Sequence, residues 1–142
     1  MRRGRSGWSY QQLGEHHKAI DDFTDAIELD ADYYMAFVNR GCSYLQAGEY
    51  YKAIDDFTFA IEVDPNYSIT FDNRGYCYFQ LGEYYKAIDD FTVAIDLDPN
   101  NDNPLRRRAA SYLKLGMWKE QNEDLGRVEE LHEQNNPSGR KE

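Results

Sequence analysis

The side chains that could bind a metal ion or act in catalysis are three histidines, two cysteines and several pairs of aspartates. His16 and His17 are adjacent, so on a helix they point in different directions, and His132 is remote in the sequence. Cys42 and Cys77 stand 35 residues apart, one more than the interval at which other residues recur, so their side chains should diverge. We therefore expect no metal site, no disulfide and no cofactor.

Pairs of aspartates recur at 21–22, 55–56 and 89–90. Two neighbouring carboxylates can serve as acid and base in catalysis when their pKa values are driven apart. Here the pairs fall on predicted helices, where we expect them to be exposed and partly balanced by lysines four residues before the second acid. These are Lys18, Lys52 and Lys86. The sequence contains no recognisable nucleophile with a base and no phosphate-binding loop, so we expect no catalytic residue and no enzyme activity.

The elements that must position any functional residue repeat every 34 residues. The recurring glycines are Gly14, Gly48, Gly82 and Gly116, and the recurring tyrosines are Tyr10, Tyr44, Tyr78 and Tyr112. The block Lys-Ala-Ile-Asp-Asp-Phe-Thr begins at residues 18, 52 and 86. Self-similarity at such an interval indicates stacked supersecondary units rather than one central core.

The unit at residues 34–67 predicts two antiparallel helices. The first spans 34–47, where aromatic and small residues share one stripe, and Gly48 ends it because glycine adopts a left-handed conformation without a Cβ penalty. The second spans Tyr50–Val63, where apolar residues follow the i, i+3, i+4, i+7 pattern of one buried face. Pro65 closes the unit, because it disfavours helix in the preceding residue.

This pattern of small and aromatic positions resembles the tetratricopeptide repeat. The resemblance covers residues 1–134 and implies an all-α solenoid of about four helix-turn-helix repeats that form a right-handed superhelix. The expected units are 1–33, 34–67, 68–101 and 102–134, followed by a polar tail at 135–142. In the first unit, as in the others, the glycine (here Gly14) is expected to end the first helix.

The last and first units depart from the pattern. Gln121, Asn122 and Glu129 replace apolar residues, so residues 102–134 should act as a C-terminal cap, and Asn103-Pro104 should start its first helix. At the other end, Arg3 and Ser6 replace the phenylalanine and arginine of the middle units. The first unit is therefore either a worn natural end or a cut through a longer array, and we favour a natural or engineered short array.

Composition narrows the class of partner. The 142 residues include 16 basic and 26 acidic ones, a net charge of −10 that disfavours nucleic-acid binding. No apolar run is long enough for a membrane span, and no apolar segment follows the basic start as a secretory signal would require. With two cysteines, a cytoplasmic location is expected. A peptide or protein partner therefore fits best, bound to a monomer or weak homo-oligomer.

The resemblance implies that the first helices line a concave groove and that the acidic second helices form the back. First helices here carry a second apolar stripe, which usually marks an interaction site unless neighbouring helices bury it. We expect the groove to be lined by Trp8, Met35, Val38, Asn39, Cys42, Leu45, Ile69, Asn73, Tyr76, Phe79, Arg106, Arg107, Ala110, Leu113 and Lys114. Arg40 and Arg74, beside this stripe, should instead reach acids of a neighbouring second helix.

Some members of the family bind acidic chaperone tails through lysines, asparagines and an arginine on three adjacent first helices. Only Asn73 and Arg107 match that pattern here, which disfavours a chaperone tail as the ligand. Arg106, Arg107 and Lys114 still make one groove end basic, so we expect a ligand with apolar residues and an acidic end. The function predicted is thus a protein-interaction module acting as an adaptor, scaffold or co-chaperone-like protein. The alternative is a structural, self-assembling repeat with no dedicated peptide ligand.

Overall fold

The computed structural model of the chain describes residues 7–29 and 34–136, with side chains described for residues 14–27 and 34–136. Every regular element within these residues is an α-helix. The helices are α1 (Gly7–Leu29), α2 (Tyr34–Gln46), α3 (Tyr50–Val63), α4 (Ser68–Gln80), α5 (Tyr84–Leu97), α6 (Asp102–Lys114) and α7 (Trp118–Asn135). The predicted all-α helical repeat is confirmed, as are the helices expected at 34–47 and Tyr50–Val63.

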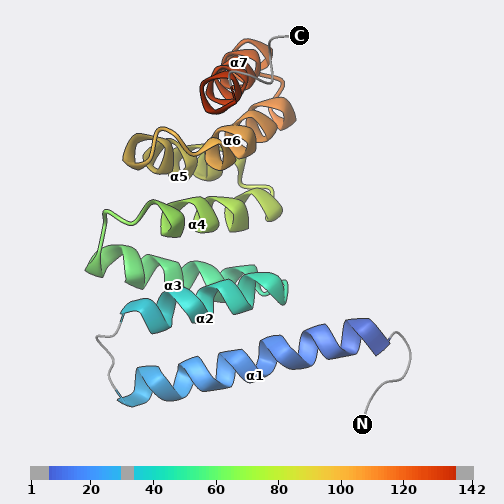
Figure 1. Cartoon of the computed structure of the whole chain (residues 1–142). Coiled ribbons are helices and arrows are strands. Elements are labelled where there is room, and N and C mark those ends of the chain that lie inside the picture. Colours follow the sequence, from blue (N-terminus) through green and yellow to red (C-terminus); the bar gives the residue numbers. More distant parts are fainter. Residues whose placement is uncertain (1–6, 30–33, 137–142) are drawn as a thin grey trace. The chain divides into compact units, whose positions relative to one another are not determined.

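The helices group into two compact units, Met1–Pro65 and Asn66–Glu142. In the first unit, α2 packs against both α1 and α3. In the second unit, α4 packs against α5 and α6, α5 packs against α6, and α6 packs against α7 (Figure 1). Among the described residues, no helix is both long and apolar enough to cross a membrane.

A glycine with positive φ makes the turn in each of three helix pairs. The φ angles are 81° at Gly48, 79° at Gly82 and 74° at Gly116. In the first of these turns, the Glu49 N–H donates to the Tyr44 carbonyl at 2.8 Å, which satisfies an orphan carbonyl of α2. The glycines therefore end the first helices as predicted and let each second helix fold back.

Close packing within a pair depends on a second glycine. A Cβ added at Gly41 would lie 2.7 Å from the Phe57 ring, and one at Gly75 would lie 2.7 Å from the Phe91 ring. Both rings are fully buried. The phenylalanine of each second helix thus fills the space that the missing side chain of the first helix leaves.

The expected turn at Gly14 is absent, because α1 runs without interruption from Gly7 to Leu29. Gly14 has no positive φ, and nothing lies within 4 Å of a Cβ added there. Arg3 stands where Phe37 and Phe71 stand in later repeats, so a folded-back helix would lack one of the apolar side chains that it buries there. Continuing the helix forms local hydrogen bonds at a cost of about 1 kcal/mol for one internal glycine.

The start of α6 also differs from the expectation. Asn101, not Asn103, is the N-cap, and its side-chain oxygen accepts a hydrogen bond from the Asn103 N–H at 3.0 Å. Pro104 consequently lies in the first turn, where its missing N–H leaves no hydrogen bond unmade. Beyond this start, Leu105, Val128 and Leu131 form the core of the last pair, with Ile95 packed against them.

Candidate interaction surface

The predicted groove residues of the first unit lie on α2. Val38 is buried, with 3% of its surface exposed, whereas Met35, Asn39, Cys42 and Leu45 are half-buried. Trp8 lies in α1, and its side chain falls outside the described residues. Val38 is thus a core residue of this structure.

In the second unit, α4 and α6 contact each other and share one surface. Residues at i, i+3, i+4 and i+7 lie on one face of a helix, and this rule selects the members of each helix. We define the α4–α6 surface as the face formed by Ile69, Asp72, Asn73 and Tyr76 of α4 together with Arg107, Ala110 and Lys114 of α6. Ile69 and Lys114 are exposed and Asp72 is buried. The other four members are half-buried.

Arg107 connects the two helices of this surface. Its Nη1 donates to Asp72 Oδ1 at 3.1 Å, and its guanidinium carbon lies 4.6 Å from the centre of the Tyr76 ring. The Tyr76 hydroxyl in turn accepts a hydrogen bond from Gln80 Nε2 at 2.6 Å. Burial raises the pKa of Asp72 above its ordinary value, and the charge and hydrogen bond of Arg107 offset only part of that rise.

Two other predicted groove residues, Phe79 and Leu113, are not among the residues that define this surface. The Phe79 ring packs edge-on against Tyr84, with the ring centres 5.4 Å apart, so Phe79 is part of the packing at the α4–α5 turn. Leu113 is exposed on α6, but it lies about 100° around the helix from Lys114. Neither is a member of the α4–α6 surface.

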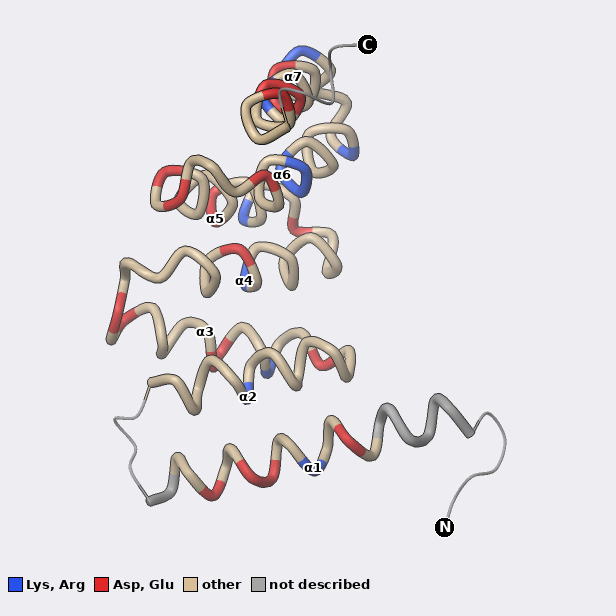
Figure 2. Tube along the Cα trace, viewed as in Figure 1, with Lys and Arg blue, Asp and Glu red and all other residues tan. Residues whose placement is uncertain are grey.

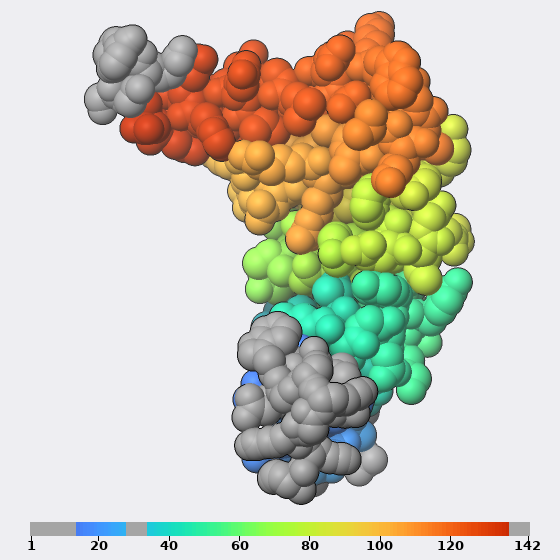
Figure 3. All heavy atoms as spheres, turned by 90° about the vertical axis from the view of Figure 1, so that its right-hand side faces the viewer, coloured from blue at the N-terminus to red at the C-terminus, as the bar shows by residue number. Residues whose placement is uncertain are grey.

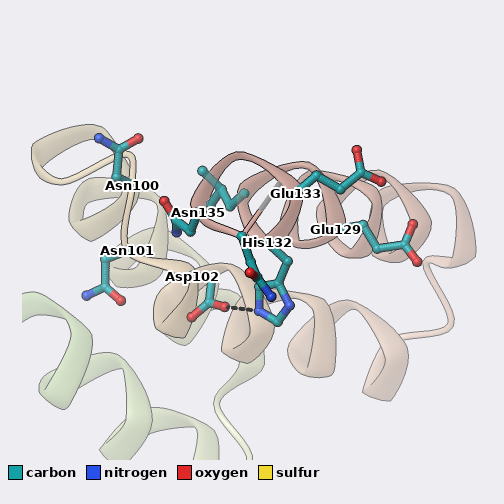
Figure 4. A pocket seen from close by; sticks show the side chains of 9 residues that line it. Asn100, Asn101, Asp102, Glu129, His132, Glu133 and Asn135 are labelled. Atoms are coloured by element: carbon teal, nitrogen blue, oxygen red, sulfur yellow. Dashed lines mark hydrogen bonds and ion pairs between the residues drawn. The ribbon is translucent and has the colours of Figure 1, made fainter. Parts of the chain in front are cut away.

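Arg106 contacts Asp102 and His132, two residues that line a polar cleft near the start of α6. Its Nη2 lies 3.1 Å from Asp102 Oδ2, and that carboxylate is also 3.0 Å from His132 Nε2. The hydrogen bond from Arg106, followed by that from His132, lowers the pKa of Asp102. The cleft has a volume of about 750 Å³, and its lining residues include Asn100, Asn101, Glu129, Glu133 and Asn135 (Figure 4). No cluster of metal-ligating side chains occurs among the described residues.

An arginine–aspartate pair recurs in three consecutive helix pairs. Arg40 binds Asp56 through Nε and Nη2, both at 2.7 Å. The same two-pronged contact joins Arg74 to Asp90 at 2.8 and 2.9 Å. Arg108 and Asp124 repeat it at 2.8 and 2.7 Å. The hypothesis that Arg40 and Arg74 reach acids of a second helix is therefore confirmed.

These pairs correct one expectation about the aspartates. Asp56 and Asp90 were expected to be exposed, yet only 4% and 5% of their surfaces are accessible. Their neighbours Asp55 and Asp89 are exposed, because consecutive helical residues point in different directions. The available signal was an arginine 16 residues before each buried aspartate, repeated at the 34-residue interval. Within the second unit, Figure 2 shows several acidic residues on α5 and several basic residues on α6.

Comparisons with known proteins agree with this geometry. Tetratricopeptide repeat patterns match residues 34–67 and 73–101, and a further one matches residues 3–33. A sequence comparison with curated proteins gave no match.

Solved structures of helical repeat proteins are similar to this chain. A crystal structure of MamA is 23% identical, with a TM-score of 0.83, and the match covers 91% of this chain and 75% of that one. MamA from Desulfovibrio magneticus RS-1 is 21% identical, with a TM-score of 0.82, and the match covers 86% of this chain and 69% of that one. The first repeat domain of Spaghetti (RPAP3), bound to the HSP90 peptide SRMEEVD, is 29% identical, with a TM-score of 0.68 and coverage of 72% and 81%. With its repeated helix pairs and matching residue pattern, the chain belongs to the tetratricopeptide repeat family.

Proposed function

We propose that this protein-interaction module binds a peptide segment of its partner on the α4–α6 surface. The observation that carries the proposal is the composition of that surface, which combines the exposed Ile69 side chain with the half-buried Tyr76 ring and Ala110. An aromatic ring held in place beside exposed apolar area is typical of an energetic hot spot in a protein interface. Binding, rather than catalysis, is the activity that these side chains can support.

Similar structures support the mode of binding. Two repeat domains of Spaghetti (RPAP3), 28% and 29% identical to this chain, were solved with the HSP90 peptide SRMEEVD bound. In the first unit, considered by itself, we also propose Met35, Asn39, Cys42 and Leu45 of α2 as partner-binding residues. We also propose a cytoplasmic location. Cys42 and Cys77 form no disulfide, which agrees with a reducing compartment.

The ligand is expected to place apolar residues over Ile69 and Tyr76. An acidic end, if the ligand has one, would face Lys114, because Arg106 and Arg107 are both engaged in ion pairs. Lys114 is exposed in the last turn of α6.

Selection from a displayed peptide library, followed by isothermal titration calorimetry of the selected peptides, tests this proposal. Tyr76→Ala and Ile69→Ala should each weaken binding about tenfold, because both remove hot-spot area. The matched control is Tyr85→Ala on α5, since Tyr85 is 66% exposed and lies off the surface. Equal affinities for wild type and Tyr76→Ala would refute the proposed site.

A further inference from the structure

Asp72 and Arg107 form a contact that the repeat itself does not prescribe. The positions equivalent to Asp72 carry Val38 in α2 and Arg106 in α6, and the position equivalent to Arg107 carries Asn73 in α4. The arginine–aspartate pairs with 16-residue spacing, by contrast, recur in three helix pairs. The Asp72–Arg107 pair is therefore a local feature of the α4–α6 surface and not part of the scaffold.

The two charges of this pair differ in their access to solvent. The Asp72 side chain is 11% exposed, whereas the Arg107 side chain is 35% exposed and lies over the Tyr76 ring. A ligand can therefore reach the Arg107 guanidinium. The Asp72 carboxylate is largely shielded from solvent, so water could not replace the hydrogen bond that it accepts from Arg107. A ligand would thus contact Arg107, whose guanidinium already donates a hydrogen bond to Asp72.

Displacing Asp72 would be costly for an acidic ligand. A ligand carboxylate that took the Arg107 hydrogen bond would leave a buried negative charge without its partner. It would also bring a second negative charge close to the first, which is unfavourable at short range. A neutral or apolar segment over Tyr76 leaves the ion pair intact and avoids both costs.

Building on the proposed function, we infer that Asp72 sets the specificity of the α4–α6 surface by holding Arg107. The surface then accepts uncharged, apolar peptide segments at Tyr76 and rejects acidic ones. Asp72 acts as a specificity-determining residue, since it has no need to touch the ligand itself. Removing its charge should turn Arg107 into a receptor for carboxylates.

The test uses the acidic peptide SRMEEVD and the uncharged analogue SQMQQVN, acetylated at its N-terminus and amidated at its C-terminus, with binding to the full chain followed by fluorescence anisotropy. Asp72→Asn should bind SRMEEVD about tenfold more tightly than wild type, the effect of one charge-assisted hydrogen bond. Its affinity for the neutral analogue should not change. Adding Arg107→Gln to Asp72→Asn should abolish the gain.

The control is Asp89→Asn, which makes the same change in net charge at an exposed site on α5. It should leave the affinity for SRMEEVD unchanged. Circular dichroism confirms that each variant folds, and Asp72→Ser supplies a second neutral variant. The inference is overturned if neither Asp72 variant gains affinity for SRMEEVD, or if Asp89→Asn gains as much. Library-selected peptides that bind in a Tyr76-dependent manner while Asp72→Asn gains nothing would defeat this inference but leave the proposed function standing.

Discussion

At the residue scale, the recurring arginine–aspartate pairs join the two helices in three helix pairs, α2–α3, α4–α5 and α6–α7. The Arg74 and Asp90 side chains are 19% and 7% exposed, and the guanidinium lies within 6 Å of the Phe71 and Tyr78 rings. Burial raises the pKa of Asp90, with the hydrogen bond from Arg74 opposing the shift. The hydrogen bond and positive charge of Arg74 therefore stabilise the Asp90 carboxylate in its buried position.

Removing one partner of this pair should cost more than removing both. We expect Asp90→Ala to lower the free energy of unfolding by about 3 kcal/mol, because it removes the carboxylate that balances the charge of a largely buried guanidinium. The double variant Arg74→Met/Asp90→Leu should lose much less, since no charge remains inside. Urea denaturation followed by circular dichroism measures both.

The control for this prediction is Asp89→Ala, a neighbouring exposed aspartate whose loss should change stability by less than about 0.5 kcal/mol. Similar unfolding midpoints for Asp90→Ala and Asp89→Ala would show that the buried pair contributes little.

At the element scale, the glycine that recurs every 34 residues adopts two different backbone conformations. Gly48, Gly82 and Gly116 have positive φ and end first helices, whereas Gly14 lies inside the continuous helix α1. The difference comes from the neighbouring segments, because a turn is worth making only when the helix that folds back can bury apolar side chains.

This distinction predicts opposite effects of the same substitution. Gly14→Ala should stabilise the chain by up to about 1 kcal/mol, because alanine is the better residue inside a helix. Gly48→Ala should destabilise it by about 1 kcal/mol, because alanine is strained at a φ of 81°. Thermal and urea unfolding measure both variants. A destabilised Gly14→Ala protein would indicate a turn at that glycine after all.

At the scale of the whole molecule, the outer face of α7 differs from the faces on which other helices stack. The Thr92 hydroxyl of α5 accepts a hydrogen bond from Arg108 of α6 at 3.0 Å, and Thr24 of α1 does the same for Arg40 at 3.1 Å. The equivalent residue of α7 is Gly126. In the space-filling view, α7 lies at the edge of the second unit with no other described helix beyond it (Figure 3).

The α7 face is polar and therefore predicts that the chain does not associate with a second copy through this face. Light scattering should give a mass near 16.7 kDa at every concentration, because Asn122 and Glu129 replace the apolar residues of inner helices on this face. The variant Asn122→Ile/Gly126→Thr/Glu129→Ile restores the inner-helix residues, so its apparent mass should rise with concentration. A rise already present in the wild-type protein would instead favour the self-assembling alternative.

The helix pairs could be predicted from sequence because they depend on local, repeated signals. Apolar residues at helical spacing mark a buried face, and a glycine that follows such a stretch can end the helix, so α2 and α3 begin at the expected residues Tyr34 and Tyr50. The 16-residue arginine–aspartate spacing is also a repeated sequence signal, and it distinguishes buried Asp56 from exposed Asp55.

Which groups meet across helices depends on how the helices pack. The 34-residue pattern was sufficient to predict an all-α repeat with one glycine turn in each complete pair, because those features depend on neighbours in the chain. It could not determine that α1 lacks the turn, since that depends on whether a folded-back helix finds apolar partners. Nor could it determine that Arg107 binds Asp72, 35 residues away on another helix, because the distance between them depends on how α4 and α6 pack.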